Sequence, residues 1–167
     1  MILLTGFEPW DVFNVNPSGD VARALGGHVL PVDYRKADAA LRRLLKTKPS
    51  AVVMLGLGAG RTSIDIELVA RNLDDAGTRV RKPIEPGGPE RRTSTLPIGH
   101  LLDRLRAAGL PARPSPDAGT FLCNHVFYVA AGRVDVPCGF IHLPPLEVLP
   151  LDDQLRAVRL ILGALGG

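Results

Sequence analysis

The sequence predicts an α/β fold with a mostly parallel central sheet. Short apolar segments rich in β-branched residues alternate with amphipathic segments along the 167 residues. Such alternation is typical of parallel strands joined by helices that cover the sheet. The length suits one hydrophobic core, and no repeat, linker or low-complexity segment interrupts the chain. We therefore expect a single domain over residues 1–167.

The first half of the chain is expected to contain four strands and two helices. Residues 1–6 form an apolar run that ends at a glycine, and a helix follows at 16–27 with Asn16 or Ser18 near its cap. The other elements expected here are a brief strand at 28–34, a helix with one apolar face at 34–50, a buried strand at 50–61 and an alternating strand at 62–75.

The second half begins with a long loop. Residues 77–94 contain Gly, Pro and charged residues without a period, and unstructured loops of this length tend to be functional. A helix is expected at 94–109, with Thr95 as its cap and Pro97 in its first turn. The elements expected after it are a short strand at 110–115, a helix at 121–133, a strand at 137–144 that ends at His142, and a closing helix at 150–167.

Composition excludes several classes of protein. The formal net charge is only +3, and no basic tract with interleaved aromatic residues is present, which argues against a nucleic-acid partner. No apolar run approaches the ~18–20 residues of a membrane span. The two cysteines make no metal pattern and are too few for a disulfide scaffold. The start of the sequence lacks the features of a signal peptide, and a cytoplasmic protein is the expectation.

A glycine-rich turn, Gly56 to Arg61, follows the strand at 50–61 and invites comparison with dinucleotide-binding loops. That fingerprint needs a third glycine where this chain has Arg61. The residues that follow alternate like a strand instead of opening a helix. We therefore interpret the turn as one wall of a pocket at the carboxyl end of a strand.

Cys123 lies near the expected start of the helix at 121–133. Free cysteines are usually buried hydrophobic residues. At a helix N-terminus, however, unpaired N–H groups and the helix dipole favour the thiolate and could also stabilise an oxyanion. Cys138, within an apolar strand, has no such setting and is interpreted as structural.

A thiolate nucleophile needs an imidazole to accept and return a proton. His28 and His100 are expected at the surface, and His125 is two positions from Cys123 on another face of the helix. His142 ends a buried strand, where the catalytic groups of α/β sheets gather. His142 is therefore the preferred partner.

Glu67 occupies an unusual place for an acid, between Ile66 and Leu68 in an apolar stretch. A buried carboxylate is seldom left unpaired, and one that bound the far side of the imidazole would complete a triad. The alternative is a solvated glutamate on the outer face of a half-buried strand.

Taken together, several segments resemble pyroglutamyl peptidase I, a family of cysteine peptidases. They occur in the family's order and cover most of the chain, and the blocks around Cys123 and His142 are the most specific. The matching segments are residues 3–10, 16–18, 56–76, 94–98, 118–128 and 139–146.

The resemblance implies a three-layer α/β/α sandwich with a twisted, mixed but mostly parallel sheet. It implies a cytoplasmic catalytic domain that removes N-terminal pyroglutamate from peptides, without cofactor or metal, and that forms a homo-oligomer. Carried over by position, it implies Cys123 as nucleophile, His142 as acid and base, and Glu67 as the carboxylate that orients the imidazole.

The resemblance also implies an aromatic and apolar pocket for the pyroglutamyl ring. This ring is a neutral lactam, so flat apolar walls and hydrogen bonds to the ring amide should recognise it. Phe7, Trp10, Phe121 and Leu122 match the family's pocket positions, and Leu57 stands where a polar residue is often found.

The chain departs from the family pattern in its length and at Gly77. The loops around 26–30, 77–92 and 132–138 are short for the family. Gly77 stands where many members have an arginine credited with helping at the oxyanion, and Arg79 is the nearest substitute. Two alternatives stay open: a thiol amidase acting on another small lactam or cyclic amide, and a catalytically impaired module that binds pyroglutamyl groups.

Overall fold

A computed structural model describes residues 1–75 and 80–166 of the chain. The five helices in these ranges are α1 (Pro17–Ala24), α2 (Tyr34–Leu45), α3 (Ile98–Ala107), α4 (Leu122–Ala131) and α5 (Leu151–Gly166). The eight strands in the same ranges are β1 (Ile2–Phe7), β2 (His28–Leu30), β3 (Ala51–Leu57), β4 (Ile64–Glu67), β5 (Val69–Arg71), β6 (Arg91–Thr93), β7 (Ala112–Ser115) and β8 (Cys138–Leu143). Each helix lies in a segment for which the sequence predicts one.

Six strands form one twisted sheet in the order β2-β1-β3-β8-β4-β7. All neighbouring strands are parallel except β8 and β4, which are antiparallel. The predicted mixed, mostly parallel sheet is confirmed. Because β1, β3 and β8 run in one direction, their carboxyl ends meet at one edge, and the residues that follow each strand come together there.

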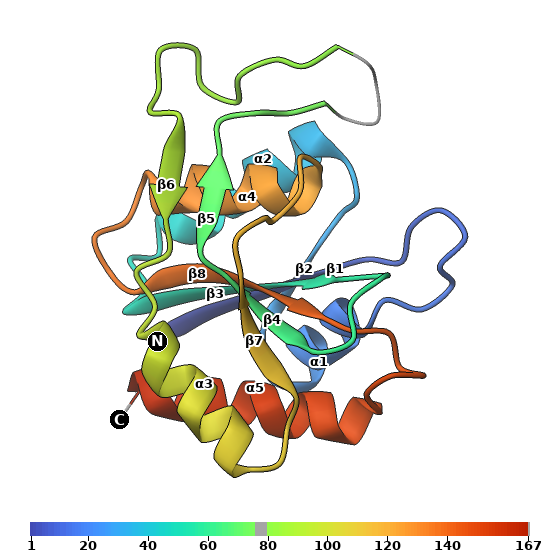
Figure 1. Cartoon of the computed structure of the whole chain (residues 1–167). Coiled ribbons are helices and arrows are strands. Elements are labelled where there is room, and N and C mark those ends of the chain that lie inside the picture. Colours follow the sequence, from blue (N-terminus) through green and yellow to red (C-terminus); the bar gives the residue numbers. More distant parts are fainter. Residues whose placement is uncertain (76–79, 167) are drawn as a thin grey trace.

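Helices cover both faces of the sheet, so the three-layer prediction is confirmed. Figure 1 shows α1, α3 and α5 on one face and α2 and α4 on the other. Each face has its own apolar cluster, one that includes Leu55, Ile66 and Ile141 and one that includes Met54, Phe127 and Phe140. Burial on both faces explains why the central strands are nearly continuous apolar runs.

The predicted strand at 62–75 divides into two. β4 stays in the main sheet, while β5 leaves it and pairs with β6 in a separate two-stranded antiparallel sheet. β6 lies inside the segment predicted to be a loop, so that prediction is wrong for Arg91–Thr93. Pairing between backbone groups requires no apolar pattern, and the ends of β6 are exposed.

The start of α3 differs from the prediction. The helix begins at Ile98, Pro97 occupies the cap position, and no side chain caps it. The Thr95 hydroxyl instead accepts a hydrogen bond from the Cys138 N–H at 2.9 Å. Thr95 therefore joins the segment before α3 to β8.

No helix in the described part of the chain combines the length and the apolar character needed to cross a membrane.

Candidate active site

Cys123 is the second residue of α4 and is partly exposed. The first N–H group of α4 with a helical acceptor is that of His125, which donates to the carbonyl of the cap residue Phe121 at 3.0 Å. The N–H groups before it are those that a helix start leaves without an intrahelical acceptor. This terminus presents donors and the positive end of the helix dipole beside the thiol.

The other cysteine lies in a different environment. Cys138 is 2% exposed within β8, and burial raises the pKa of its thiol to about 12. A thiol with so high a pKa stays protonated and unreactive near neutral pH. This environment fits the structural role that the sequence indicates for Cys138.

Gly56 lets α4 approach the end of β3. A methyl group at this position would lie 2.8 Å from the Cys123 sulfur and 2.7 Å from the ring of Phe140. Both distances are shorter than side-chain carbons tolerate. The absence of a side chain at Gly56 is therefore what brings the thiol over the sheet.

His142 and Glu67 form a buried pair. His142 Nδ1 lies 2.7 Å from Glu67 Oε1, and the two residues are 6% and 0% exposed. The antiparallel register of β4 and β8 sets Asp65 opposite His142. Glu67 is two residues beyond Asp65 on the same face of β4, so its carboxylate can reach the imidazole diagonally. Because Glu67 accepts a hydrogen bond from the Nδ1–H group, Nε2 is the ring nitrogen left for another partner.

The pKa of His142 is raised to about 9. Burial by itself would lower it, but hydrogen bonds between the imidazole and the side chains of Cys123 and Glu67, together with the charges of both groups, outweigh the burial. The imidazole is therefore held in its charged form near neutral pH. A charged imidazole beside a thiol stabilises the thiolate.

Arg61 is a residue of this site that sequence reasoning did not assign to it. Its guanidinium lies 3.3 Å from Glu67 Oε1, donates to Asp65 at 2.6 Å, and donates to the Asp117 carbonyl at 3.0 Å. A methyl group at Gly58 would lie 2.3 Å from the Arg61 stem. The glycine-rich turn thus places a guanidinium against the buried glutamate, and the arginine that excluded a dinucleotide loop was the available signal.

A cavity of about 390 Å³ opens beside Cys123 and His142. Trp10 and Phe121 stand at its mouth with 42% and 58% of their surface exposed. The other side chains that line it are Val32, Tyr34, Leu57, Ala118 and Leu122. Four of the five residues expected in a substrate pocket, Trp10, Leu57, Phe121 and Leu122, therefore meet at one cavity.

Phe7 is the fifth, and it does not line this cavity. Its side chain is 4% exposed and packs in the apolar cluster between the sheet and α2 and α4. The expectation that Phe7 contacts substrate is corrected to a core position. Phe7 is the last residue of β1, and because side chains alternate along a strand it lies on the same face as Leu3, which belongs to the same cluster.

The remaining histidines lie outside the cavity. His28 and His100 are exposed, as expected. His125 Nδ1 lies 2.7 Å from Asp74 and its Nε2 lies 3.1 Å from Asp38, so it faces away from Cys123. Gly77 and Arg79 lie outside the described residues.

Within residues 1–75 and 80–166, no three His, Cys, Asp or Glu side chains gather closely enough to hold a metal ion. The arrangement at Cys123 can support chemistry that needs a nucleophile, a proton donor and a set of backbone N–H groups. Acyl transfer through a thioester is such chemistry.

Comparison with known proteins identifies relatives along nearly the whole chain. The sequence model of the pyroglutamyl peptidase family matches residues 1–157. A pyrrolidone-carboxylate peptidase from Gloeobacter violaceus is 41% identical over 98% of this chain and 96% of its own. One from Halalkalibacterium halodurans is 37% identical over 97% of both chains.

Solved structures of the same kind superpose closely. Pyrrolidone carboxyl peptidase from Thermus thermophilus matches with a TM-score of 0.91 and 39% identity over 97% of this chain and 98% of its own. The Pyrococcus furiosus protein matches with a TM-score of 0.93 and 32% identity over 98% and 96% of the two chains.

Proposed function

The chain belongs to the pyroglutamyl peptidase family, and from this premise we propose that it hydrolyses the amide bond that follows an N-terminal pyroglutamyl residue. In this proposal Cys123 is the nucleophile, His142 is the general acid and base, and Glu67 orients the imidazole. The observation that carries it is the meeting of a thiol at a helix start with a buried His–Glu pair, at the mouth of an apolar cavity.

The first half of the reaction forms an acyl-enzyme. The Cys123 thiolate attacks the carbonyl carbon that links the pyroglutamyl residue to the next residue, and a C–S bond forms. The oxygen of this carbonyl becomes an oxyanion that faces the N–H groups at the start of α4. The His142 imidazolium then gives its Nε2 proton to the departing amine as the C–N bond breaks. The products of this half are a thioester and a peptide shortened by one residue.

The second half releases pyroglutamate. Neutral His142 takes a proton from water, and the resulting hydroxide attacks the thioester carbonyl. The tetrahedral intermediate collapses, the C–S bond breaks, and the thiolate beside the imidazolium is restored. Glu67, which accepts from Nδ1, keeps the ring in one tautomer and supports its charged form in both halves.

The lining of the cavity suits a lactam better than an ordinary amino terminus. A free α-ammonium would need an anionic partner, and none of the described residues that line this cavity is an aspartate or glutamate. Apolar and aromatic side chains make up most of the wall, which fits a flat neutral ring. This supports pyroglutamyl peptides as the substrate class.

Hydrolysis of a pyroglutamyl coumarin amide tests the proposal. The wild-type chain should release the coumarin and a prolyl amide should be a poor substrate, while iodoacetamide and Cys123→Ala should each abolish release. Cys138→Ala is the matched control, because the other thiol lies inside β8, and it should keep its activity. No release by the wild type, or full release by Cys123→Ala, would contradict the proposal.

The same assay separates the alternatives left open by the sequence. Release from other small lactam amides but not from the pyroglutamyl amide would indicate a thiol amidase of different specificity. Binding of pyroglutamyl peptides without any turnover would indicate an impaired module.

A further inference from the structure

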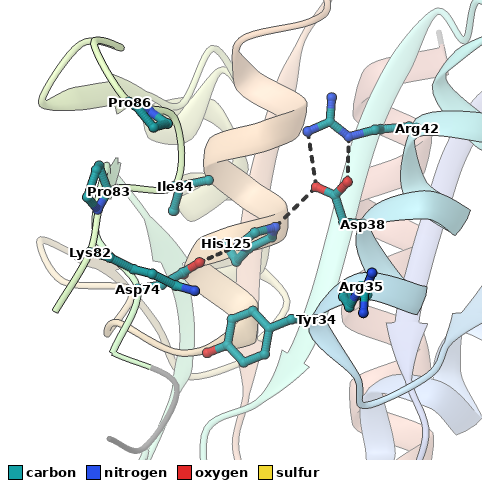
Figure 2. A pocket seen from close by; sticks show the side chains of 10 residues that line it. All are labelled: Tyr34, Arg35, Asp38, Arg42, Asp74, Lys82, Pro83, Ile84, Pro86 and His125. Atoms are coloured by element: carbon teal, nitrogen blue, oxygen red, sulfur yellow. Dashed lines mark hydrogen bonds and ion pairs between the residues drawn. The ribbon is translucent and has the colours of Figure 1, made fainter. Parts of the chain in front are cut away.

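Tyr34 lines two neighbouring cavities. It is the first residue of α2 and lines the apolar cavity that contains Cys123. It also lines a second cavity of about 550 Å³, whose polar members include Asp38, Asp74 and His125 (Figure 2). Its ring therefore closes one end of the apolar cavity.

The ring of Tyr34 is held in place from the second cavity. It packs edge-on against His125, with the ring centroids 5.4 Å apart and the planes at 89°. His125 is itself fixed by carboxylates on both nitrogens, Asp74 at 2.7 Å and Asp38 at 3.1 Å. Figure 2 shows this chain of contacts between α2, α4 and the segment at Asp74, with the Tyr34 hydroxyl directed away from Asp38.

The Tyr34 hydroxyl is enclosed, and it has no hydrogen-bond partner among the described residues. Burial raises the pKa of the phenol, and the charges of Asp74, Asp75 and Cys123 raise it further. The hydroxyl therefore keeps its proton at any pH at which the protein works. It is a neutral donor enclosed without a partner among the described residues, and an enclosed donor of this kind favours a ligand that brings an acceptor.

Few other side chains of the apolar cavity could recognise a polar ring. Of its described lining residues other than Cys123 and His142, only Trp10 and Tyr34 carry polar side-chain atoms, and Trp10 is partly exposed at the mouth. The side chain of Leu57, at the end of β3, has only carbon atoms. A lactam placed there brings one carbonyl and one N–H that need partners.

We propose that the Tyr34 hydroxyl donates a hydrogen bond to the lactam carbonyl of the bound pyroglutamyl ring and thereby selects lactams over simple pyrrolidine rings. The proposal rests on the function proposed above and names a specificity-determining residue within it. A prolyl group has the same ring size but lacks this carbonyl. With proline bound, the hydroxyl would remain enclosed without a partner, and discrimination of this kind is strong when the donor is buried.

Tyr34→Phe tests the inference with the pyroglutamyl coumarin amide. The variant should lose about tenfold or more in kcat/KM, mainly through a higher KM, because the bond is made in both the bound substrate and the transition state. The ratio of pyroglutamyl to prolyl hydrolysis should fall by the same factor. Tyr128→Phe is the matched control, since that hydroxyl already donates to the Pro89 carbonyl at 2.7 Å, and it should keep the wild-type ratio.

Two further measurements distinguish substrate recognition from other roles of the hydroxyl. The urea midpoint of Tyr34→Phe should equal or exceed that of the wild type, because the substitution removes a donor that has no partner. The rate of Cys123 alkylation by iodoacetamide and its pH dependence should be unchanged, because the hydroxyl is not the support of the thiolate.

The outcomes separate this inference from the proposed function. A wild-type chain inactive on the pyroglutamyl amide would contradict the function itself. An active wild type with an equally active and equally selective Tyr34→Phe would overturn only the role of Tyr34. A loss confined to kcat, an altered alkylation profile or a lower urea midpoint would also overturn it, since each assigns the hydroxyl to the thiolate or to the fold.

Discussion

At the scale of single residues, the pair of Glu67 and His142 determines the ionisation of the site. Glu67 lies at the end of β4, fully buried, and one oxygen is shared between the imidazole at 2.7 Å and Arg61 at 3.3 Å. Burial disfavours a charged imidazole, so the pKa of about 9 depends on Cys123 and on this carboxylate. Arg61 holds the carboxylate where the ring can reach it.

Glu67→Gln should therefore shift the pH dependence of hydrolysis. Because the pKa of His142 is raised, its charged form persists below about 9 and is lost above it. Without the carboxylate this pKa falls, and the alkaline limb of kcat/KM should move to lower pH by about 1–3 units. At pH 7 we expect kcat/KM to fall about 10²-fold or more.

The pH profile of kcat/KM between pH 5 and pH 10 checks this expectation. Glu90→Gln is the control, because that side chain is 91% exposed and far from the imidazole pair in the fold. An alkaline limb that does not move in Glu67→Gln would show that Glu67 does not support the imidazolium.

At the scale of elements, the site depends on how closely α4 approaches the end of β3. Cys123 lies on α4 and His142 on β8, and β3, which neighbours β8 in the sheet, contributes Gly56. β3 and β8 are paired in register from Val52 and Cys138 to Leu57 and Leu143, so Gly56 lies opposite His142. A side chain at Gly56 would separate the helix from the sheet.

Gly56→Ala should consequently damage both activity and stability. The added methyl would contact the Cys123 sulfur at 2.8 Å, and moving the helix away would displace the thiol from the imidazole. We expect a loss of about 1–3 kcal/mol in the free energy of unfolding and at least about tenfold in kcat/KM.

Gly60→Ala is the matched control for this change. Gly60 belongs to the glycine-rich turn just beyond β3, and a methyl group there would meet no atom within 4 Å. Urea unfolding and the coumarin assay on both variants make the comparison. Equal behaviour of the two variants would contradict the role assigned to the close approach at Gly56.

At the scale of the whole molecule, carboxylates paired with arginines connect segments that are distant in the sequence. Asp65 is fully buried on β4, and it accepts from Arg113 on β7 at 2.9 Å and 3.1 Å and from Arg61 at 2.6 Å. Glu85 accepts from Arg92 at 2.7 Å and from Arg133 at 2.9 Å, which joins the segment after β5 to β6 and the end of α4.

These carboxylates predict sensitivity to acid. Burial alone would raise the pKa of Asp65, but its bonds to Arg113, Ser63 and Arg61 lower it overall. The bond from Arg92 is the largest effect on Glu85 and, with Arg133, lowers its pKa to about 2. A lowered pKa contributes stability that is present above the unfolded value of about 4 and is lost as pH falls toward the folded value.

Urea midpoints between pH 7 and pH 2.5 measure this sensitivity. The midpoint should fall steadily below about pH 4.5, and the fall should be smaller in Asp65→Asn, which is already destabilised at pH 7. Asp152→Asn, at an exposed position in the first turn of α5, should follow the wild-type curve. A wild-type midpoint independent of pH over this range would contradict the prediction.

Much of the fold could be predicted because it is encoded locally. The 3.6-residue period of α2 and the apolar runs of β3 and β8 identify elements without knowledge of their partners. Three features depend on partners and were not predicted correctly: the departure of β5 from the sheet, the pairing of β6, and the cap of α3. Each depends on hydrogen bonds of backbone groups to partners that are distant in the sequence, and no local residue pattern indicates those partners.

By itself, the sequence predicted which residues would carry the chemistry. A cysteine at a helix start, a histidine at a strand end and an acid in an apolar stretch are each unusual for its setting. Only the tertiary structure decided that Glu67 faces His142 and that Arg61 forms an ion pair with the same carboxylate. It also decided that Phe7 belongs to the core and that Tyr34 lines the apolar cavity. The physical reason is that residue type and spacing determine what a side chain can do, whereas strand register, sheet twist and the closeness of packing determine what it meets.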